Sequence, residues 1–183
     1  KTAVDRYRGS VEGLFEKNHV EVIYGKGTLR RGRTVEVELA EGGREFFEGK
    51  TVILAAGAVP MMNEIPGADL PGVWNSDRLL AAKSWNFDRL TIMGGGVIAV
   101  EFATLFNNLC SNVTIVEKKK HLMAPMDDVM STALERVLRR QGNQVYCDST
   151  VTELSQGENG LNCVITPNKG GEPILTRSGQ DVM

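Results

Sequence analysis

Hydrophobic positions recur along the chain with two periods, one typical of helices and one typical of strands. Before residue 60, apolar side chains at helical spacing predict a helix that ends near Asn18. Alternating or continuous apolar runs predict strands over residues 20–24, 34–39 and 51–56. Residues 41–44 are typical of a hairpin turn, and the strand that returns from it contains Phe46 and Phe47. The first part of the chain is therefore predicted to be one helix followed by several strands.

After residue 60 the pattern changes, because prolines and glycines make residues 60–72 a stiff connection with little regular structure. Ser76 is placed to cap a short helix over residues 76–82. The apolar pattern then predicts a strand that ends at Met93, a helix through Leu109 and a strand over 113–116. Further predicted elements follow in this order: a helix from Asp127 with Glu135 and Arg136 facing solvent, a strand at 145–147, antiparallel strands at 151–154 and 161–165, and the start of an apolar run at 181–183.

The most informative turn joins the strand before it to the helix after it with the pattern Gly-x-Gly-x-x-Ala. Glycines let a backbone bend sharply and approach a pyrophosphate, and the helix N-terminus presents free N–H groups to it. Ala99 replaces the third glycine, a position that governs helix–strand packing, so one added methyl is tolerable. The predicted contact residues are Gly94, Gly95, Gly96, Val97, Ile98 and Ala99.

An acidic residue at the tip of the next strand completes a dinucleotide-binding unit. Glu117 lies roughly twenty residues beyond the glycines, where a carboxylate accepts hydrogen bonds from the ribose hydroxyls. Such a carboxylate repels the additional phosphate of NADP, whereas the three lysines that follow it at 118–120 attract one. A run of lysines is also typical of a solvated loop. We therefore predict NAD as the dinucleotide.

The amino-acid composition excludes some classes of function and partner but identifies none. The 183 residues include 42% apolar and 24% charged residues, and the net charge of −2 gives no reason to expect a nucleic acid or an anionic membrane as partner. No apolar run approaches the length of a membrane span, and the N-terminus has no signal-peptide pattern. Cys110, Cys147 and Cys163 form no close pair, which favours a reducing compartment. We expect a cytoplasmic protein without a metal site.

Taken in order, several segments resemble the flavin-dependent pyridine nucleotide–disulfide oxidoreductases, most closely the dihydrolipoamide dehydrogenases among them. These segments are residues 11–15, the strand ends at 25–27 and 53–57, and the sequence GGGVIAVEF from Gly94. The resemblance implies a Rossmann-like α/β fold that binds FAD and NAD(P), with a parallel sheet, helices and a β-meander layer. It divides the chain into a partial FAD-binding domain (1–74), a linker (75–86) and an NAD-binding domain truncated at its C-terminus (87–183).

The resemblance also assigns roles to single residues. Glu101 matches a glutamate directed towards the nicotinamide, although an acid in a first helical turn is also favoured by the helix dipole. Val151 matches an apolar residue near the adenine, and it fits a sheet core equally well. The remaining matches are to FAD-contacting positions, all of which also fit simple turns: Gly27, Ala56, Gly57 and Ala58. The family usually has threonine at 56 and serine at 58, so two hydroxyls are missing beside the flavin.

The family's chemistry requires groups that these 183 residues do not contain. No two cysteines lie four residues apart, no glycine motif precedes Gly94, and neither His19 nor His121 has the context of the family's catalytic histidine. We therefore expect no catalytic residue in this segment. In the complete protein, a dithiol would reduce FAD, and FAD would reduce NAD.

The resemblance implies a homodimer, alone or within a 2-oxo acid dehydrogenase complex. Several alternatives remain open. They are a soluble transhydrogenase, a mercuric reductase, an NADH oxidase, a non-catalytic NAD-binding module, and a fragment that binds nothing tightly.

Overall fold

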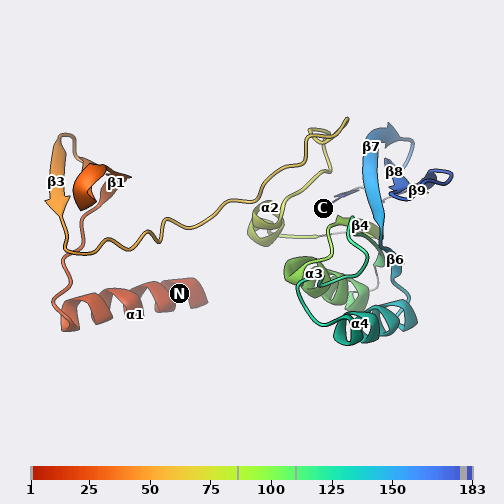
Figure 1. The fold of residues 1–183 in the computed structure, drawn as a ribbon, viewed down its shortest axis with the longest axis horizontal. Coiled ribbons are helices and arrows are strands. Elements are labelled where there is room, and N and C mark those ends of the chain that lie inside the picture. Colours follow the sequence, from red (N-terminus) through yellow and green to blue (C-terminus); the bar gives the residue numbers. More distant parts are fainter. Residues whose placement is uncertain (1, 86, 110, 178–180, 183) are drawn as a thin grey trace. The chain divides into compact units, whose positions relative to one another are not determined.

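The computed structural model describes residues 2–85, 87–109, 111–177 and 181–182. Contacts divide the chain into two compact units, Lys1–Gly57 and Ala58–Met183, which are described separately (Figure 1). The second unit starts earlier than the boundary expected from the sequence, because Ile65, Leu70 and Val73 pack against its core. The assignment of the two parts to FAD and NAD stays a prediction.

The first unit begins with helix α1 (Ala3–Lys17), which confirms the helix predicted to end near Asn18. A capping box holds its start: the Thr2 hydroxyl accepts from the Asp5 amide, and the Asp5 carboxylate accepts from the Thr2 amide. No residue of α1 is buried. The helix is therefore stabilised by local interactions rather than by a core.

A three-stranded antiparallel sheet follows, in the order β1 (Gly25–Leu29), β2 (Thr34–Leu39) and β3 (Arg44–Glu48), with a short 3₁₀ turn η1 (Arg31–Arg33) after β1. The predicted strand at 34–39, the turn at 41–44 and the returning strand are confirmed. Glu36 on β2 is buried, and its carboxylate lies 2.6 Å from Arg30 and 3.2 Å from Arg44. This ion network joins the strand to its neighbours.

Two strand predictions in this unit are wrong. Residues 20–24 form no strand, because the ladder pairs Gly25 with Leu39, the last residue of β2, and the residues before Gly25 extend beyond its end. Residues 51–56 also form no strand: they have no ladder partner among the described residues, and Ile53 and Leu54 are 85% and 76% exposed. A continuous apolar run needs paired strands on both sides to form the interior of a sheet.

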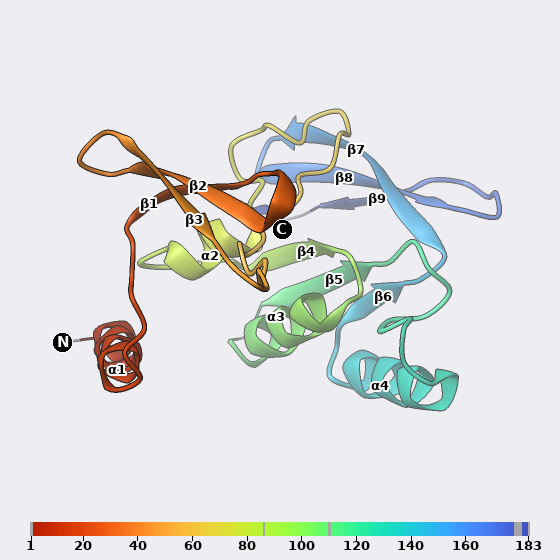
Figure 2. The same cartoon turned by 60° about the vertical axis from the view of Figure 1, so that its left-hand side comes forward.

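The second unit contains a parallel sheet in the order β10-β4-β5-β6: β10 (Asp181–Val182), β4 (Arg89–Met93), β5 (Asn112–Val116) and β6 (Gln144–Tyr146). Helices α3 (Val97–Asn108) and α4 (Asp128–Arg140) lie on one face of this sheet (Figure 2). Their buried side chains and those of the strands form one core, which includes Leu90, Ile115, Phe106 and Leu138. The predicted sequence of strand, helix, strand, helix and strand is confirmed, although β6 ends before Cys147.

An antiparallel meander covers the other face of the parallel sheet (Figures 1 and 2). It consists of β7 (Ser149–Gly157), β8 (Gly160–Pro167) and β9 (Ile174–Arg177). The hairpin between β7 and β8 was predicted and β9 was not, while β10 lies where the start of an apolar run was expected. Val116, Val151, Cys163 and Ile165 are among the residues of a second core between the meander and the sheet.

Two local predictions in the second unit are corrected. The short helix α2 (Ser76–Ala81) is capped by Asn75, whose Oδ1 accepts from the Arg78 amide at 2.8 Å, not by Ser76. Glu135 does not face solvent, because its side chain is only 15% exposed. Cys110 lies outside the described residues, and Cys147 and Cys163 are free thiols.

Candidate nucleotide-binding site

The glycine turn sits at the carboxyl end of the parallel sheet, between β4 and α3. The Gly94 amide donates to the Val116 carbonyl at 2.8 Å, which joins the ends of β4 and β5. Gly94 has φ +122°, a conformation that L side chains rarely adopt, and no atom lies within 4 Å of where a Cβ would stand. The turn therefore needs a glycine at this position for its backbone, and it leaves open space beside it.

Gly95 is required for a different reason, which is close approach. A Cβ on Gly95 would stand 2.6 Å from Leu122 Cδ2 and 2.9 Å from both Cβ and Cγ of Glu117. The Met123 amide also donates to the Gly95 carbonyl at 2.7 Å. The turn therefore rests directly on the segment that begins with Glu117.

Gly96 is the N-cap of α3, and it provides no side chain to cap the helix. The N–H groups of the first turn are thus available to an anion, with the helix dipole in the same direction. Val97 and Ile98 are more than half exposed, while Ala99 is only 8% exposed and belongs to the core. The methyl of Ala99 therefore packs inside, where the sequence pattern expects close helix–strand contact.

A cleft runs along this edge of the sheet as two adjoining cavities, of about 460 and 270 Å³. The larger one is lined by Gly94, Gly96 and Val97 on one side and by residues 60–63 and Trp74 on the other. The smaller one contains Glu117, Lys118 and Val151. Met93, Gly94, Asn63 and Ile65 line both. Ligands of open α/β sheets bind in such a crevice at the carboxyl ends of the strands.

Glu117 is held firmly at the tip of β5. Its amide donates to the Tyr146 carbonyl at 2.8 Å, and its carbonyl accepts from the Ser149 amide at 3.1 Å. Its Oε1 accepts from the Lys119 amide at 2.7 Å, which orients the carboxylate. The residue is only 8% exposed, so its charge acts in a partly desolvated position at the cavity wall.

The structure brings Val151 to the same cavity as Glu117, as an adenine-contacting residue requires. Val151 is 4% exposed and lies beside a register shift in the β7–β8 ladder. Lys118 lines this cavity too, and its carbonyl accepts from Asn168 Nδ2 at 2.7 Å. The lysine run is exposed, as a solvated loop should be, but its first member is also within the candidate site.

The remaining predicted residues are described by the elements on which they lie. Glu101 is exposed on α3 and lines neither cavity. Gly27 lies on β1 opposite Val37, and Ala56, Gly57 and Ala58 lie in an exposed segment without regular structure, with φ +77° at Gly57. The roles of these residues towards nicotinamide and FAD stay predictions.

Sequence reasoning missed two contributors to the site. Residues 60–72 were interpreted only as a stiff connection, yet Asn63 and Ile65 line both cavities together with Gly94 of the glycine turn. Leu122, which is completely buried beneath Gly95, was not singled out. The one signal that marks it is an apolar residue two positions after the lysine run, separated from it by His121. Among the described residues, no group of three His, Cys, Asp or Glu side chains could hold a metal ion.

Comparisons with known proteins identify the family of the chain. The sequence model of the pyridine nucleotide-disulphide oxidoreductase family matches residues 2–175. A dihydrolipoyl dehydrogenase of Pseudomonas aeruginosa is 33% identical over 159 residues, which are 86% of this chain and 33% of that protein. A dihydrolipoyl dehydrogenase of Acholeplasma laidlawii is 33% identical over 155 residues, 82% of this chain and 44% of that protein. The chain thus spans a third to under half of these relatives.

Solved structures show the same fold. The HOCl-induced flavoprotein disulfide reductase RclA of Escherichia coli matches with a TM-score of 0.68 and 27% identity, over 98% of this chain and 41% of that chain. LpdA of Mycobacterium tuberculosis matches with a TM-score of 0.73 and 21% identity, over 96% of this chain and 38% of that chain, so that it supports the fold alone. The predicted fold class is confirmed. In the parts of the chain that are described, no helix has the length and apolar character needed to cross a membrane.

Proposed function

Because the chain belongs to the pyridine nucleotide-disulphide oxidoreductase family, whose members use FAD and NAD(H), we propose that its second unit binds the adenosine diphosphate half of NAD. The observation that carries this proposal is the contact of Gly95 with Glu117, which sets the pyrophosphate turn directly against the ribose acid. The cleft is also of adequate size, since its larger cavity alone measures about 460 Å³.

Each part of the cleft has a role in this proposal. The backbone of residues 94–96 and the first N–H groups of α3 hold the pyrophosphate. The carboxylate of Glu117 accepts hydrogen bonds from the adenosine ribose, and Val151 packs against the adenine. One carboxylate oxygen of Glu117 accepts from the Lys119 amide, which leaves the other to accept from the ribose in this proposal.

For the complete protein, we propose a dihydrolipoamide dehydrogenase, in which FAD carries electrons from a dithiol to NAD⁺. The relatives with that name support this choice, while the similarity to other disulfide reductases supports the coarser family. Residues 1–74 would contribute part of the FAD site, with 75–86 as linker and 87–183 as the NAD domain. A cytoplasmic homodimer, alone or in a 2-oxo acid dehydrogenase complex, completes this proposal.

Titration of the chain with NADH and NADPH tests the site. We expect Glu117→Gln to weaken NADH binding about 5- to 10-fold, because a carboxylate oxygen accepts a hydrogen bond roughly twice as strongly as the amide oxygen that replaces it. Glu117→Arg should additionally shift the preference towards NADPH. Glu153→Gln is the matched control, since Glu153 is an exposed acid on β7. Equal affinities for NADH in the wild type and Glu117→Gln would contradict the role of Glu117.

A second candidate is a binding module without turnover. A binding module predicts tight NADH binding without reduction of lipoamide, in the complete protein as well as in this chain. Lipoamide reduction by the complete protein with NADH would exclude this candidate and support the dehydrogenase.

A further inference from the structure

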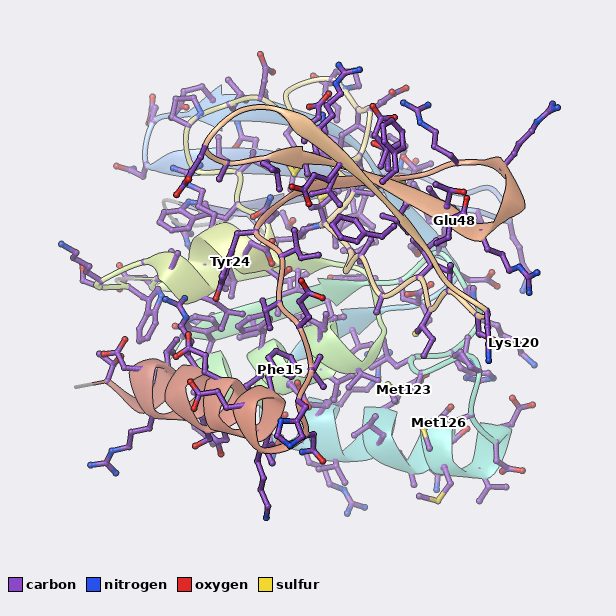
Figure 3. All side chains as sticks on the ribbon, turned by 90° about the vertical axis from the view of Figure 1, so that its left-hand side faces the viewer. Phe15, Tyr24, Glu48, Lys120, Met123 and Met126 are labelled. Atoms are coloured by element: carbon purple, nitrogen blue, oxygen red, sulfur yellow. The ribbon has the colours of Figure 1, made fainter. Side chains whose placement is uncertain are left out.

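The segment from Glu117 to Met123 forms the floor of the glycine turn. Leu122 is 0% exposed and would lie 2.6 Å from a Cβ on Gly95, while the Met123 amide donates to the Gly95 carbonyl at 2.7 Å. Met123 itself has φ +52°, so the backbone turns sharply at this contact. Lys120, Met123 and Met126 mark the course of the segment towards α4 in Figure 3. Any shift of this floor therefore moves Gly95.

The floor is fixed at both ends by different elements. At its start, Glu117 is bound to the Tyr146 carbonyl and the Ser149 amide, which belong to the strands. At its far end, the Leu122 amide donates to Glu135 Oε1 at 3.0 Å. Glu135 lies in the middle of α4 and lines neither cavity of the nucleotide cleft. One end of the floor is thus held by a side chain that is remote from any ligand.

The same oxygen of Glu135 has two further partners. His121 Nδ1 lies 3.3 Å away, and the Cys147 thiol donates to it at 3.5 Å. Burial first, and then the negative charge of Glu135, raises the pKa of Cys147 to about 12, so that this thiol keeps its proton at neutral pH. The Leu122 amide, His121 and the Cys147 thiol therefore all contact one carboxylate oxygen of Glu135. The side chain of Glu135 is 15% exposed.

From this convergence we propose that Glu135 is a positioning residue for the dinucleotide site, acting through Leu122 and Met123 on Gly95. The inference rests on the proposed NAD function and extends it to α4. By accepting a hydrogen bond from the Leu122 amide, the carboxylate holds this segment in contact with the glycine turn. Its loss leaves the buried Leu122 amide with only the Cys147 sulfur, a weak acceptor, and the segment moves to satisfy that amide elsewhere.

Two variants of Glu135 separate an acceptor from a merely bulky side chain. In the 183-residue chain, Glu135→Leu removes the acceptor, whereas Glu135→Gln keeps one amide oxygen. The probe is ADP-ribose, which contains the adenosine and pyrophosphate but no nicotinamide. We expect Glu135→Leu to weaken ADP-ribose binding about tenfold, as the loss of one hydrogen bond to a charged group would. Glu135→Gln should restore most of the affinity.

Arg139→Leu is the control for a general loosening of α4. Arg139 lies one turn further along the helix, and its Nη2 donates to the Val145 carbonyl at 2.6 Å. This contact ties α4 to β6 without touching residues 117–123. We expect Arg139→Leu to lower the melting temperature but to leave ADP-ribose affinity within about twofold, since its effect is on packing alone. An equal loss of affinity in Arg139→Leu and Glu135→Leu would overturn the proposal.

Amide hydrogen exchange decides the inference even if the wild-type chain does not bind ADP-ribose. Absence of wild-type binding would contradict the proposed function, but the Met123 amide still reports on the floor because it is bonded to Gly95. Glu135→Leu should accelerate exchange at Met123 about tenfold over the wild type, and Arg139→Leu should not, since the hydrogen bond that protects this amide is lost only in the first variant. Unchanged exchange at Met123 in Glu135→Leu would overturn the proposal.

Discussion

The two units of this chain differ in how much of their apolar surface is buried. Among the described residues of the first unit, only Glu36 and Val37 are buried, and Tyr7 and Ile53 are 77% and 85% exposed. In the second unit, two cores cover both faces of the parallel sheet. The first unit is held by local devices such as the capping box of α1 and the ion network of Glu36. The second is held by packing, and the candidate site lies there.

The difference in burial between the two units explains where a precise site can form. A nucleotide cradle needs backbone atoms fixed to a fraction of an ångström, and fixed positions come from groups that are themselves packed. Gly95 rests on Leu122 and Glu117, all within the second unit. In the first unit, Gly57 and its neighbours are exposed and have no comparable support among the described residues.

The largest expected effect comes from truncating one apolar side chain in each unit, a buried one in the second and an exposed one in the first. Ile115 is 0% exposed on β5, and Ile115→Ala should cost about 2–5 kcal/mol of unfolding free energy because it leaves a cavity. Leu14 is 56% exposed on α1, and Leu14→Ala should cost less than about 0.5 kcal/mol. Urea denaturation followed by circular dichroism measures both. Similar costs for the two variants would contradict the contrast.

Alkaline pH should destabilise the second unit through its buried thiols. Burial raises the pKa of Cys163 from 9.0 to about 11, so the folded thiol stays neutral where the unfolded thiol ionises. The stability that this provides is complete below pH 9 and is lost as the pH rises through 11, a change of about 3 kcal/mol. Urea denaturation between pH 8 and 10.5 tests this, with Cys163→Ala as the variant that should lose less stability. Parallel pH profiles would contradict the prediction.

The sequence predicted the second unit better than the first. The order of strand, glycine turn, helix, strand and acid around Gly94 and Glu117 followed from local patterns, since each element is short-range and its period is unambiguous. The prediction of a strand at 51–56 was wrong because an apolar run indicates burial but does not specify the neighbouring strands that would bury it. The prediction that Glu135 faces solvent was wrong because a charged side chain on a helix is expected to be exposed. The sequence pattern does not show that a distant amide, here that of Leu122, donates a hydrogen bond to its oxygen.

Within the site, the cavity wall at Asn63 and the floor at Leu122 escaped prediction because both depend on contacts between segments far apart in sequence. Residues 60–72 have no period, so no pattern places them. The glycine pattern identified Gly94 and Gly95 but did not distinguish their reasons, which are a positive φ at one and a close contact at the other.

The same substitution should have opposite signs in the two units. Gly95→Ala would place a Cβ 2.6 Å from Leu122 Cδ2 and 2.9 Å from Glu117, which should cost about 1–3 kcal/mol and weaken NADH binding. Gly13→Ala in α1 meets no atom within 4 Å and should favour the helix by about 0.5–1 kcal/mol. Thermal unfolding and helix content by circular dichroism measure both. A Gly95→Ala variant that is as stable as the wild type and binds NADH normally would contradict the close contact.

The smallest effect concerns helix caps, and it tests whether the two units unfold independently. Asp127 caps α4 by accepting from the Val129 amide at 2.8 Å, and Thr2 caps α1 from its hydroxyl. Replacing either capping residue by alanine should destabilise its helix by about 1 kcal/mol. Because α4 contributes Leu138 to a core and α1 contributes no buried residue, Asp127→Ala should lower the cooperative unfolding free energy. Thr2→Ala should reduce the helix content at low denaturant concentration, while the midpoint of the main unfolding transition stays the same. If Thr2→Ala instead shifts the main transition as far as Asp127→Ala does, α1 is coupled to the core, and the contrast between a locally held unit and a packed one fails.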